Sequence, residues 1–158
     1  MPVVVRRAGT AAATIVSALN DDVQAVHAAA LPWRFKVPGP DTFPPAVAAK
    51  ILAKPETLVF IAELAGAPAG YAYAEVARLP DRPMHRAYDM VYLHHISVRP
   101  ATRRQGVGEA LLAAVRNAGK AVGIDLVALD VWAFNEPARA FFRKQGFAVY
   151  NERLWNRP

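Results

Sequence analysis

One junction constrains the fold of this chain more than any other segment. A run of β-branched residues ends at Val98, a basic loop with Gly106 and Gly108 follows, and an alanine- and leucine-rich stretch begins at once. This order predicts a strand, a tight loop and a helix in direct succession. Such a junction points backbone N–H groups and a helix N-terminus at one spot, which suits a phosphate or pyrophosphate group. Arg103 and Arg104 add positive charge to the loop.

Two common phosphate-binding motifs do not fit this loop. A P-loop requires G-x-x-x-x-G-K-[ST], and the chain contains neither Gly-Lys-Ser nor Gly-Lys-Thr. A dinucleotide fingerprint requires a third glycine, but Leu111 stands in its place, and the loop lies past mid-chain rather than after an opening strand. The remaining pattern is Arg103-x-x-Gly106-x-Gly108, which a basic loop that merely caps a helix also satisfies.

The composition indicates an ordinary globular protein. The chain has 158 residues, of which 54% are hydrophobic and 20% charged, so we expect a single domain over residues 1–158. No apolar run reaches the roughly 20 residues that span a bilayer, and residues 1–7 lack the order of a signal peptide. We therefore expect a cytoplasmic protein with no membrane partner. The absence of cysteine excludes disulfides, thiolate metal sites and cysteine nucleophiles.

The charge pattern favours a small phosphorylated ligand over a nucleic acid. The net charge is +6, from 19 basic and 13 acidic residues. The arginines are scattered, and neither a basic helix nor an aromatic RNA-stacking motif is visible, so we expect no nucleic-acid partner. We expect no catalytic metal either, because no histidine has metal-ligand spacing with a carboxylate. The histidines are His27, His85, His94 and His95.

Hydrophobic periodicity and turn residues predict alternating strands and helices. The predicted strands span residues 3–7, 58–64, 69–77, 88–98, 126–132 and 147–155. The predicted helices span residues 10–31, 45–53, 108–122 and 136–145, and residues 20–22 are expected to interrupt the first of them. This order predicts an α/β (α+β) fold, with a mixed, mostly antiparallel central sheet of about six to seven strands and helices on both faces.

A second motif lies downstream of the glycine loop, at residues 135–147. Physically it is a capped helix. Asn135 is a suitable N-cap, Pro137 is tolerated in the first turn, and Gly146 is a suitable left-handed residue after the last turn. Many helices begin and end in this way, so the caps alone indicate structure rather than function.

Together the two motifs resemble the GCN5-related N-acetyltransferase (GNAT) superfamily. The loop is similar to that family's acetyl-coenzyme A (acetyl-CoA) pattern [Q/R]-x-x-G-x-[G/A]. The helix is similar to the family's second signature, N-x-x-A-x-x-[F/L]-Y-x-K-x-G-F. The resemblance covers residues 58 to 150 closely and the N-terminal third in outline. The residues that match the second signature in register are Asn135, Ala138, Phe141, Lys144, Gly146 and Phe147.

The resemblance implies the GNAT fold and direct transfer of an acetyl group from acetyl-CoA, as cosubstrate, to a primary amine of a small molecule or peptide. It places the pyrophosphate at the glycine loop and the pantetheine arm between the strand before that loop and the next parallel strand. It also allows Lys144 to reach a phosphate. The coenzyme-binding residues implied in this way are Ile96, Ser97, Val98, Arg103, Arg104, Gln105, Gly106, Val107, Gly108, Glu109, Asn135, Phe141 and Phe142.

The amine must lose a proton during the reaction, and His94 is the main candidate for the base. It stands four residues before Val98, where the arylalkylamine-acetylating branch of the family carries a catalytic histidine, and a reference pKa near 6.5 suits the task. His95, Glu75 and Asp89 are alternatives. Strand alternation predicts one face made of Tyr92, His94, Ile96 and Val98, and an opposite face made of Leu93, His95 and Ser97.

One position departs from the family pattern. The family commonly has tyrosine, as acid for the leaving thiolate, where this chain has Phe142. Either Tyr92 or Tyr150 supplies the proton instead, or the thiolate leaves without help.

The sequence is also compatible with two other functions. One is a non-catalytic acyl-CoA-binding sensor module, which Phe142 supports, and another is a basic RNA- or protein-binding domain without a coenzyme site. A homodimer formed through the C-terminal strand is a further expectation. The acceptor is not determined, although residues 33–43 and 79–86 combine aromatic and arginine side chains that suit an apolar or anionic molecule.

Overall fold

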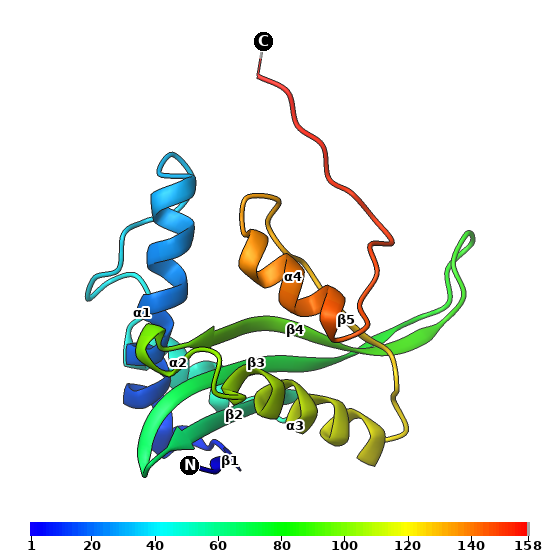
Figure 1. Cartoon of the computed structure of the whole chain (residues 1–158). Helices are drawn as coiled ribbons and strands as arrows, with labels where there is room; N and C mark the ends of the chain where they lie inside the picture. The colour runs from blue at the N-terminus through cyan, green and yellow to red at the C-terminus, as the bar shows by residue number, and fades with distance from the viewer. Residues whose placement is uncertain (158) are drawn as a thin grey trace.

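The computed structural model describes residues 1–157 and contains a mixed sheet of five strands in the order β1-β2-β3-β4-β5 (Figure 1). Neighbouring strands are antiparallel, except that β4 and β5 are parallel. The α/β fold class is thereby confirmed, with fewer strands than the six to seven expected. The strands are β1 (Val3–Arg7), β2 (Thr57–Leu64), β3 (Ala67–Leu79), β4 (Tyr88–Val98) and β5 (Val127–Leu129).

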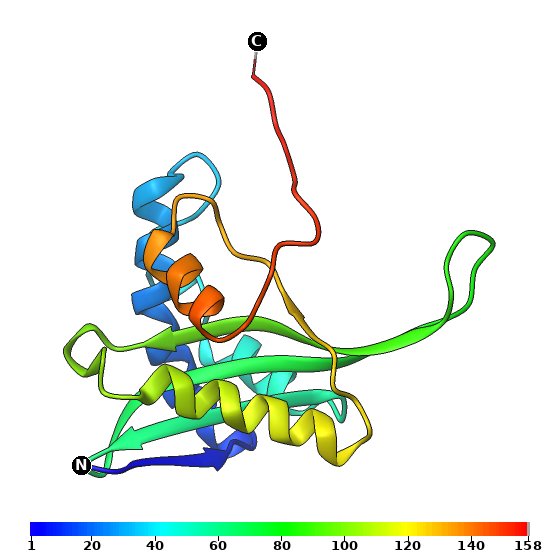
Figure 2. The ribbon, with the colours of Figure 1, turned by 45° about the vertical axis from the view of Figure 1, so that its right-hand side comes forward.

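Helices cover both faces of the sheet (Figure 2). The helices α1 (Ala13–Ala30) and α2 (Pro45–Leu52) pack on one face, while α3 (Val107–Ala121) and α4 (Glu136–Lys144) pack on the other. Short 3-10 turns, η1 (Thr10–Ala12) and η2 (Pro100–Thr102), precede α1 and α3. No helix within residues 1–157 combines the length and apolar character needed to cross a membrane.

Strand β2 shows why the sheet is buried on both sides. Its residues are almost all apolar, and successive side chains point to opposite faces. Leu58 and Phe60 pack toward α3, whereas Val59 and Ile61 pack toward α1 and α2. The core on the α3 side receives Leu112, which is fully buried like its neighbours on the inner face of that helix.

The predicted break in the first helix is wrong, because α1 runs through residues 20–22 without interruption. Asn20 is buried rather than capping a second helix, and its side-chain amide donates a hydrogen bond of 2.8 Å to the Tyr71 hydroxyl on β3. A tertiary hydrogen bond thus satisfies a residue that, in the sequence, favours helix ends.

The predicted C-terminal strand is also wrong. Residues 147–157 form no helix or strand, and this tail runs away from the body of the molecule (Figure 1). Tyr150 is 82% exposed and Leu154 is 86% exposed. A strand needs a partner edge, and no backbone hydrogen bond joins these residues to β5 in the part of the chain that the structure describes. The sheet therefore ends at β5.

A β-bulge in β4 changes which side chains share a face. Tyr73 pairs with His95 and Ala74 pairs with Leu93, so His94 is an extra residue without its own partner on β3. The bulge reverses the alternation: Leu93 and Ile96 both pack in the core on the α3 side. Of the two faces predicted for this strand, the pairings of Ile96 with Val98 and of His95 with Ser97 are confirmed, whereas the placement of Leu93 with His95 and Ser97 is wrong. His95 and Ser97 point to the α1 side, where His95 contacts Tyr71 and Ser97 donates a hydrogen bond to the Leu19 carbonyl.

Candidate active site

The glycine loop between β4 and α3 has a backbone suited to an anion. Arg104 and Gly106 both have positive φ, 61° and 81°, on either side of Gln105. Such an alternation turns successive N–H groups toward one side, and α3 begins immediately afterwards. No side chain among residues 1–157 caps the N-terminus of α3. The first N–H groups of the helix are thus free to bind a phosphate.

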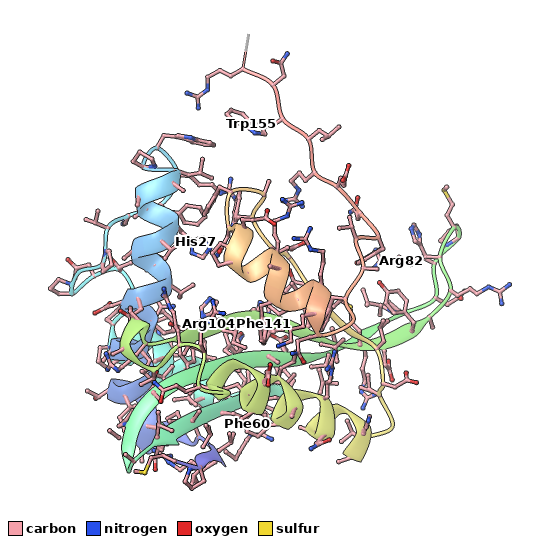
Figure 3. All side chains as sticks on the ribbon, in the orientation of Figure 1. His27, Phe60, Arg82, Arg104, Phe141 and Trp155 are labelled. Atoms are coloured by element: carbon pink, nitrogen blue, oxygen red, sulfur yellow. The ribbon has the colours of Figure 1, made fainter. Side chains whose placement is uncertain are left out.

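The two loop glycines serve different purposes. A Cβ on Gly106 would meet no atom within 4 Å, so glycine is favoured there by its φ rather than by crowding. A Cβ on Gly108 would lie 3.3 Å from the Phe141 ring, so this glycine lets α3 approach α4. Arg104 on the loop and Phe141 on α4 are labelled in Figure 3. Lys144, a candidate phosphate ligand, has its Nζ 3.6 Å from the Glu109 carboxylate in the first turn of α3.

The caps predicted for α4 are confirmed. Asn135 Oδ1 accepts a hydrogen bond of 3.2 Å from the Ala138 N–H, and Gly146 has a φ of 88°. This helix orients Phe142 into the core between the sheet and α3, where it is 6% exposed. The position where the family commonly has tyrosine is therefore an apolar wall.

A cavity of about 250 Å³ lies where β4 and β5 separate. The two strands pair only from Val91 to Leu93 and from Val127 to Leu129, and beyond these residues they diverge. The cavity reaches from α4 on one side of the sheet to α1 on the other. Its lining residues are Asn20, Val23, Gln24, His27, Phe35, Leu93, His94, His95, Ile96, Leu129, Asp130, Val131, Trp132, Asn135, Ala138 and Phe142.

His94 borders this cavity at the bulge. Its Nε2 lies 3.3 Å from Glu75 Oε2, and its ring stacks on Tyr73 with 4.6 Å between ring centroids. Burial lowers the pKa of His94, while the Glu75 carboxylate opposes that shift and the charge of Lys54 adds to it. The imidazole is therefore neutral at pH 7 and able to accept a proton.

Tyr92 is held by a different carboxylate. Its hydroxyl donates a short hydrogen bond to Asp130 Oδ2, at the end of β5. Burial, together with this hydrogen bond, raises the pKa of Tyr92 to about 12. Tyr92 therefore keeps its proton at neutral pH and already shares it with Asp130. Tyr150, the alternative acid, lies on the exposed tail.

His95 lies deeper than His94 and is less basic. Its Nδ1 lies 2.8 Å from the Tyr71 hydroxyl, which in turn accepts the hydrogen bond from Asn20. Burial, reinforced by the charges of His94 and His27, lowers the pKa of His95 to about 4. His95 is therefore uncharged at neutral pH, and it is a poorer base than His94.

The α1 end of the cavity is an aromatic cluster that the sequence did not reveal. His27 on α1 contacts Phe35, Trp132 and Phe134 at centroid distances of 5.1 to 6.4 Å. The Arg34 guanidinium lies 5.0 Å from the Trp132 ring. The only signal in the sequence was the unusual aromatic content of the proline-rich loop after α1.

The predicted residues thus divide into four groups. His94, Ile96, Asn135 and Phe142 line the cavity. Glu75 and Tyr92 flank it through His94 and Asp130. Ser97 and Val107 have buried side chains, so only their backbone groups are available to a ligand. The remaining predicted coenzyme residues lie on the glycine loop, at the end of β4 or on the face of α4 near Gly108.

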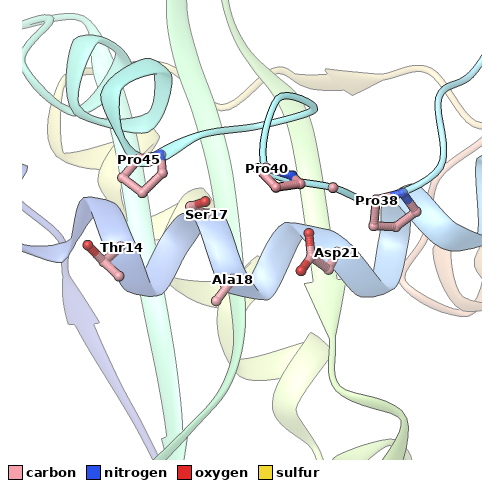
Figure 4. Close-up of a pocket in the computed structure, with 8 residues that line it drawn as sticks. Thr14, Ser17, Ala18, Asp21, Pro38, Pro40 and Pro45 are labelled. Atoms are coloured by element: carbon pink, nitrogen blue, oxygen red, sulfur yellow. The ribbon is translucent and has the colours of Figure 1, made fainter.

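A wider hollow lies elsewhere, between α1 and the loop before α2 (Figure 4). Its volume is about 390 Å³, and it opens broadly to solvent. None of its lining residues is a histidine or belongs to the glycine loop, so this hollow contains none of the predicted site residues. The hollow is lined by Thr14, Ser17, Ala18, Asp21, Pro38, Gly39, Pro40 and Pro45.

The sequence matches the family model described as Acetyltransferase (GNAT) family over residues 8–147. The chain belongs to the GNAT family. It is therefore a GNAT-type N-acetyltransferase, and the glycine loop and the cavity lie within the matched residues. No curated protein sequence matches this GNAT chain.

Solved structures share the fold of this GNAT chain at low sequence identity. A mutant of the BH1408 protein from Bacillus halodurans is 21% identical, with a TM-score of 0.92 over 98% of this chain and 99% of that one. The aminoglycoside acetyltransferase AAC(6')-Iy, bound to the bisubstrate analog CoA-S-monomethyl-acetylneamine, is 22% identical, with a TM-score of 0.71 over 100% and 99%. An aminoglycoside acetyltransferase from an uncultured soil metagenomic sample, bound to sisomicin, is 16% identical, with a TM-score of 0.67 over 99% and 95%.

Proposed function

We propose that this protein transfers the acetyl group of acetyl-CoA directly to a primary amine of a small molecule. The observation that carries the proposal is the cavity that crosses the sheet between β4 and β5, with the glycine loop on one side and a neutral histidine in its wall. Solved structures with this fold include one acetyltransferase bound to a CoA-containing bisubstrate analog and another bound to sisomicin.

The coenzyme fits the α3 side of the sheet. The pyrophosphate would bind the N–H groups from Arg104 to Gly108, with Arg103 and Arg104 compensating its charge. The pantetheine arm would follow Ile96 toward Asn135, and the thioester would lie near Phe142. No metal is needed for this chemistry.

The reaction requires a neutral amine nitrogen. An amine with a pKa near 10.4 is neutral only about once in 10^3.4 molecules at pH 7, which costs about 4.6 kcal/mol. His94 is suited to remove that proton. The Glu75 carboxylate faces Nε2 and so favours a proton there, which leaves Nδ1 unprotonated.

The step balances without another reactant. The ammonium loses its first proton to His94, which releases it to solvent, and the neutral amine nitrogen then attacks the thioester carbonyl carbon. The nitrogen passes its second proton to His94, and the C–S bond breaks with its electron pair on sulfur. A thiol with a pKa near 8.5 is a fair leaving group as the thiolate. Phe142 cannot protonate it, and Tyr92 already donates its proton to Asp130. Departure of the free thiolate is therefore part of the proposal.

The decisive experiment combines binding and turnover. Isothermal titration with acetyl-CoA should show a single binding site, and an amine panel of polyamines, amino sugars, amino acids and peptides should give sustained release of free thiol. Binding without turnover would instead indicate a sensor module. Absence of binding at millimolar acetyl-CoA would refute the coenzyme site.

A pair of glycine variants tests the loop itself. Gly106→Asp should abolish acetyl-CoA binding, because it introduces a negative charge at the anion site while the helix N-terminus remains. The matched control is Gly66→Asp in the turn between β2 and β3. Gly66 has a φ of 77° and, like Gly106, no atom within 4 Å of a Cβ. The control should therefore carry similar backbone strain and keep full affinity for acetyl-CoA. Equal affinity of the two variants would contradict the assignment of the loop.

The exposed tail supports a homodimer. Residues 147–157 carry the apolar side chains of Val149, Leu154 and Trp155 in solvent, and the outer edge of β5 is unpaired within residues 1–157. Both features belong to one chain, so two copies related by a two-fold axis would cover them together. Sedimentation of the full chain should show a dimer that Leu154→Asp weakens, and a monomer at all concentrations would refute this assembly.

A further inference from the structure

The proposed chemistry leaves His95, a partly buried histidine of the cavity wall, without a task. The His95 ring points to the α1 side of the sheet, where it contacts Tyr71 and Phe43, whereas α4 packs on the α3 side. The rings of Phe43 and Tyr73 meet it edge to face at 5.8 and 5.4 Å. These contacts fix the orientation of the imidazole.

A chain of three polar side chains determines where the proton of His95 lies. The Asn20 amide nitrogen can only donate, so the Tyr71 oxygen accepts its hydrogen bond. The Tyr71 O–H is then directed at His95 Nδ1, at 2.8 Å. Burial raises the pKa of Tyr71 well above its usual value, so the phenol keeps its proton and donates it. Nδ1 is therefore the acceptor, and the neutral ring carries its hydrogen on Nε2.

The Nε2–H group has no hydrogen-bond partner among residues 1–157, and His95 is part of the cavity wall. The Nε2–H group is thus an uncharged hydrogen-bond donor with a fixed direction, and it borders the cavity on the α1 side. The polar lining on that side also includes Gln24 and His27 from α1. A ligand atom that accepts a hydrogen bond would satisfy the Nε2–H group, whereas an apolar one would leave it unpaired.

We propose that His95 selects the acceptor substrate by donating a hydrogen bond from Nε2–H to an oxygen atom near its amine, as in an amino alcohol or amino sugar. This inference rests on the proposed acetyl transfer, because it deepens the description of the same site. His95 acts as a specificity residue and not as the base. Tyr71 and Asn20 act as positioning residues, since they hold the tautomer.

The tautomer can be measured without any substrate. Long-range 1H–15N correlation spectra of the full chain labelled with 15N-histidine should show His95 neutral, with its hydrogen on Nε2, from pH 8 down to pH 5.5. Tyr71→Phe keeps the ring but removes the donor, so the preference for the Nε2–H form should weaken. A hydrogen on Nδ1 in the unmodified protein, or a charged His95 at pH 6, would overturn the proposal while leaving the proposed function intact.

Kinetics with matched acceptors tests the selection. Each oxygen-bearing amine from the panel is compared with its analogue in which carbon replaces that oxygen. The full chain should prefer the oxygen-bearing amine, and His95→Met should raise the acceptor KM by about 3- to 10-fold, in the range expected for one neutral hydrogen bond. In His95→Met, the preference for the oxygen-bearing amine should disappear. His95→Gln, which supplies an amide N–H, should recover part of it.

Two outcomes separate the possible failures. A fall in kcat with an unchanged acceptor KM in His95→Met would place the hydrogen bond on the thioester and overturn the proposed selection. Absence of turnover with every amine would refute the proposed function and, with it, this inference. Thermal unfolding of each variant distinguishes a lost hydrogen bond from a lost fold.

Discussion

Stability should depend on pH through His95, and the structure allows the size of the effect to be worked out. The pKa of His95 is about 4 in the folded chain, against an ordinary value of 6.5 that applies when the chain is unfolded. Between these two pH values, His95 is therefore protonated in the unfolded chain but not in the folded chain. The stabilisation is complete above pH 6.5 and is lost as the pH falls toward about 4. A pKa difference of this size corresponds to a change of about 3 kcal/mol in the free energy of unfolding.

The assay is urea unfolding followed by tryptophan fluorescence, with the full chain and the variant His95→Gln compared at several pH values. Between pH 7.5 and pH 4.5, the free energy of unfolding of the full chain should fall by about 2.5 kcal/mol more than that of the variant. Burial also lowers the pKa values of His27 and His94, but both histidines remain in the variant. Subtraction of the two curves therefore removes the contributions that those two histidines make in both proteins.

Parallel pH curves for the two proteins would refute the reasoning. They would mean that His95 titrates normally in the folded chain, and therefore that its burial and its contact with Tyr71 do not keep it neutral. A steeper fall for the variant than for the full chain would contradict the sign of the effect.

Three further variants test separate parts of the fold. Leu112→Ala removes a fully buried side chain from the core between α3 and the sheet, and chemical denaturation should show a loss of about 2–5 kcal/mol. Asn135→Ala removes the cap on the Ala138 N–H and should cost about 1 kcal/mol by the same measurement, with no loss expected if that contact is absent in solution. Gly70→Ala would place a Cβ 2.5 Å from the Ser97 carbonyl oxygen, so the thermal midpoint should fall sharply, and an unchanged midpoint would contradict the close approach of β3 and β4.

Local features of the structure followed from the sequence because they depend on nearby residues. Strand β4 and helix α2 lie where alternation and a leading proline predict them. The caps at Asn135 and Gly146 depend on backbone geometry within one helical turn. The glycine loop was likewise recognisable, since the strand, the loop and the helix that form it are consecutive in the chain.

The tertiary structure decided how the side chains of the candidate site are oriented. The bulge at His94 reverses which side chains of β4 face α1, and only the register with β3 reveals it. The polar chain that orients His95 links Asn20 to Tyr71, which are 51 residues apart in sequence.

The conformation of the C-terminal tail likewise depends on the tertiary structure and not on the local sequence alone. Its apolar residues suit a strand, but whether they form one depends on a partner edge that no local pattern can report. The sequence alone therefore determined the order of elements as far as α4, the caps of that helix and the glycine loop of this GNAT protein. The orientation and protonation of the cavity's histidines arose only from packing, because burial and hydrogen bonds between distant segments decide both.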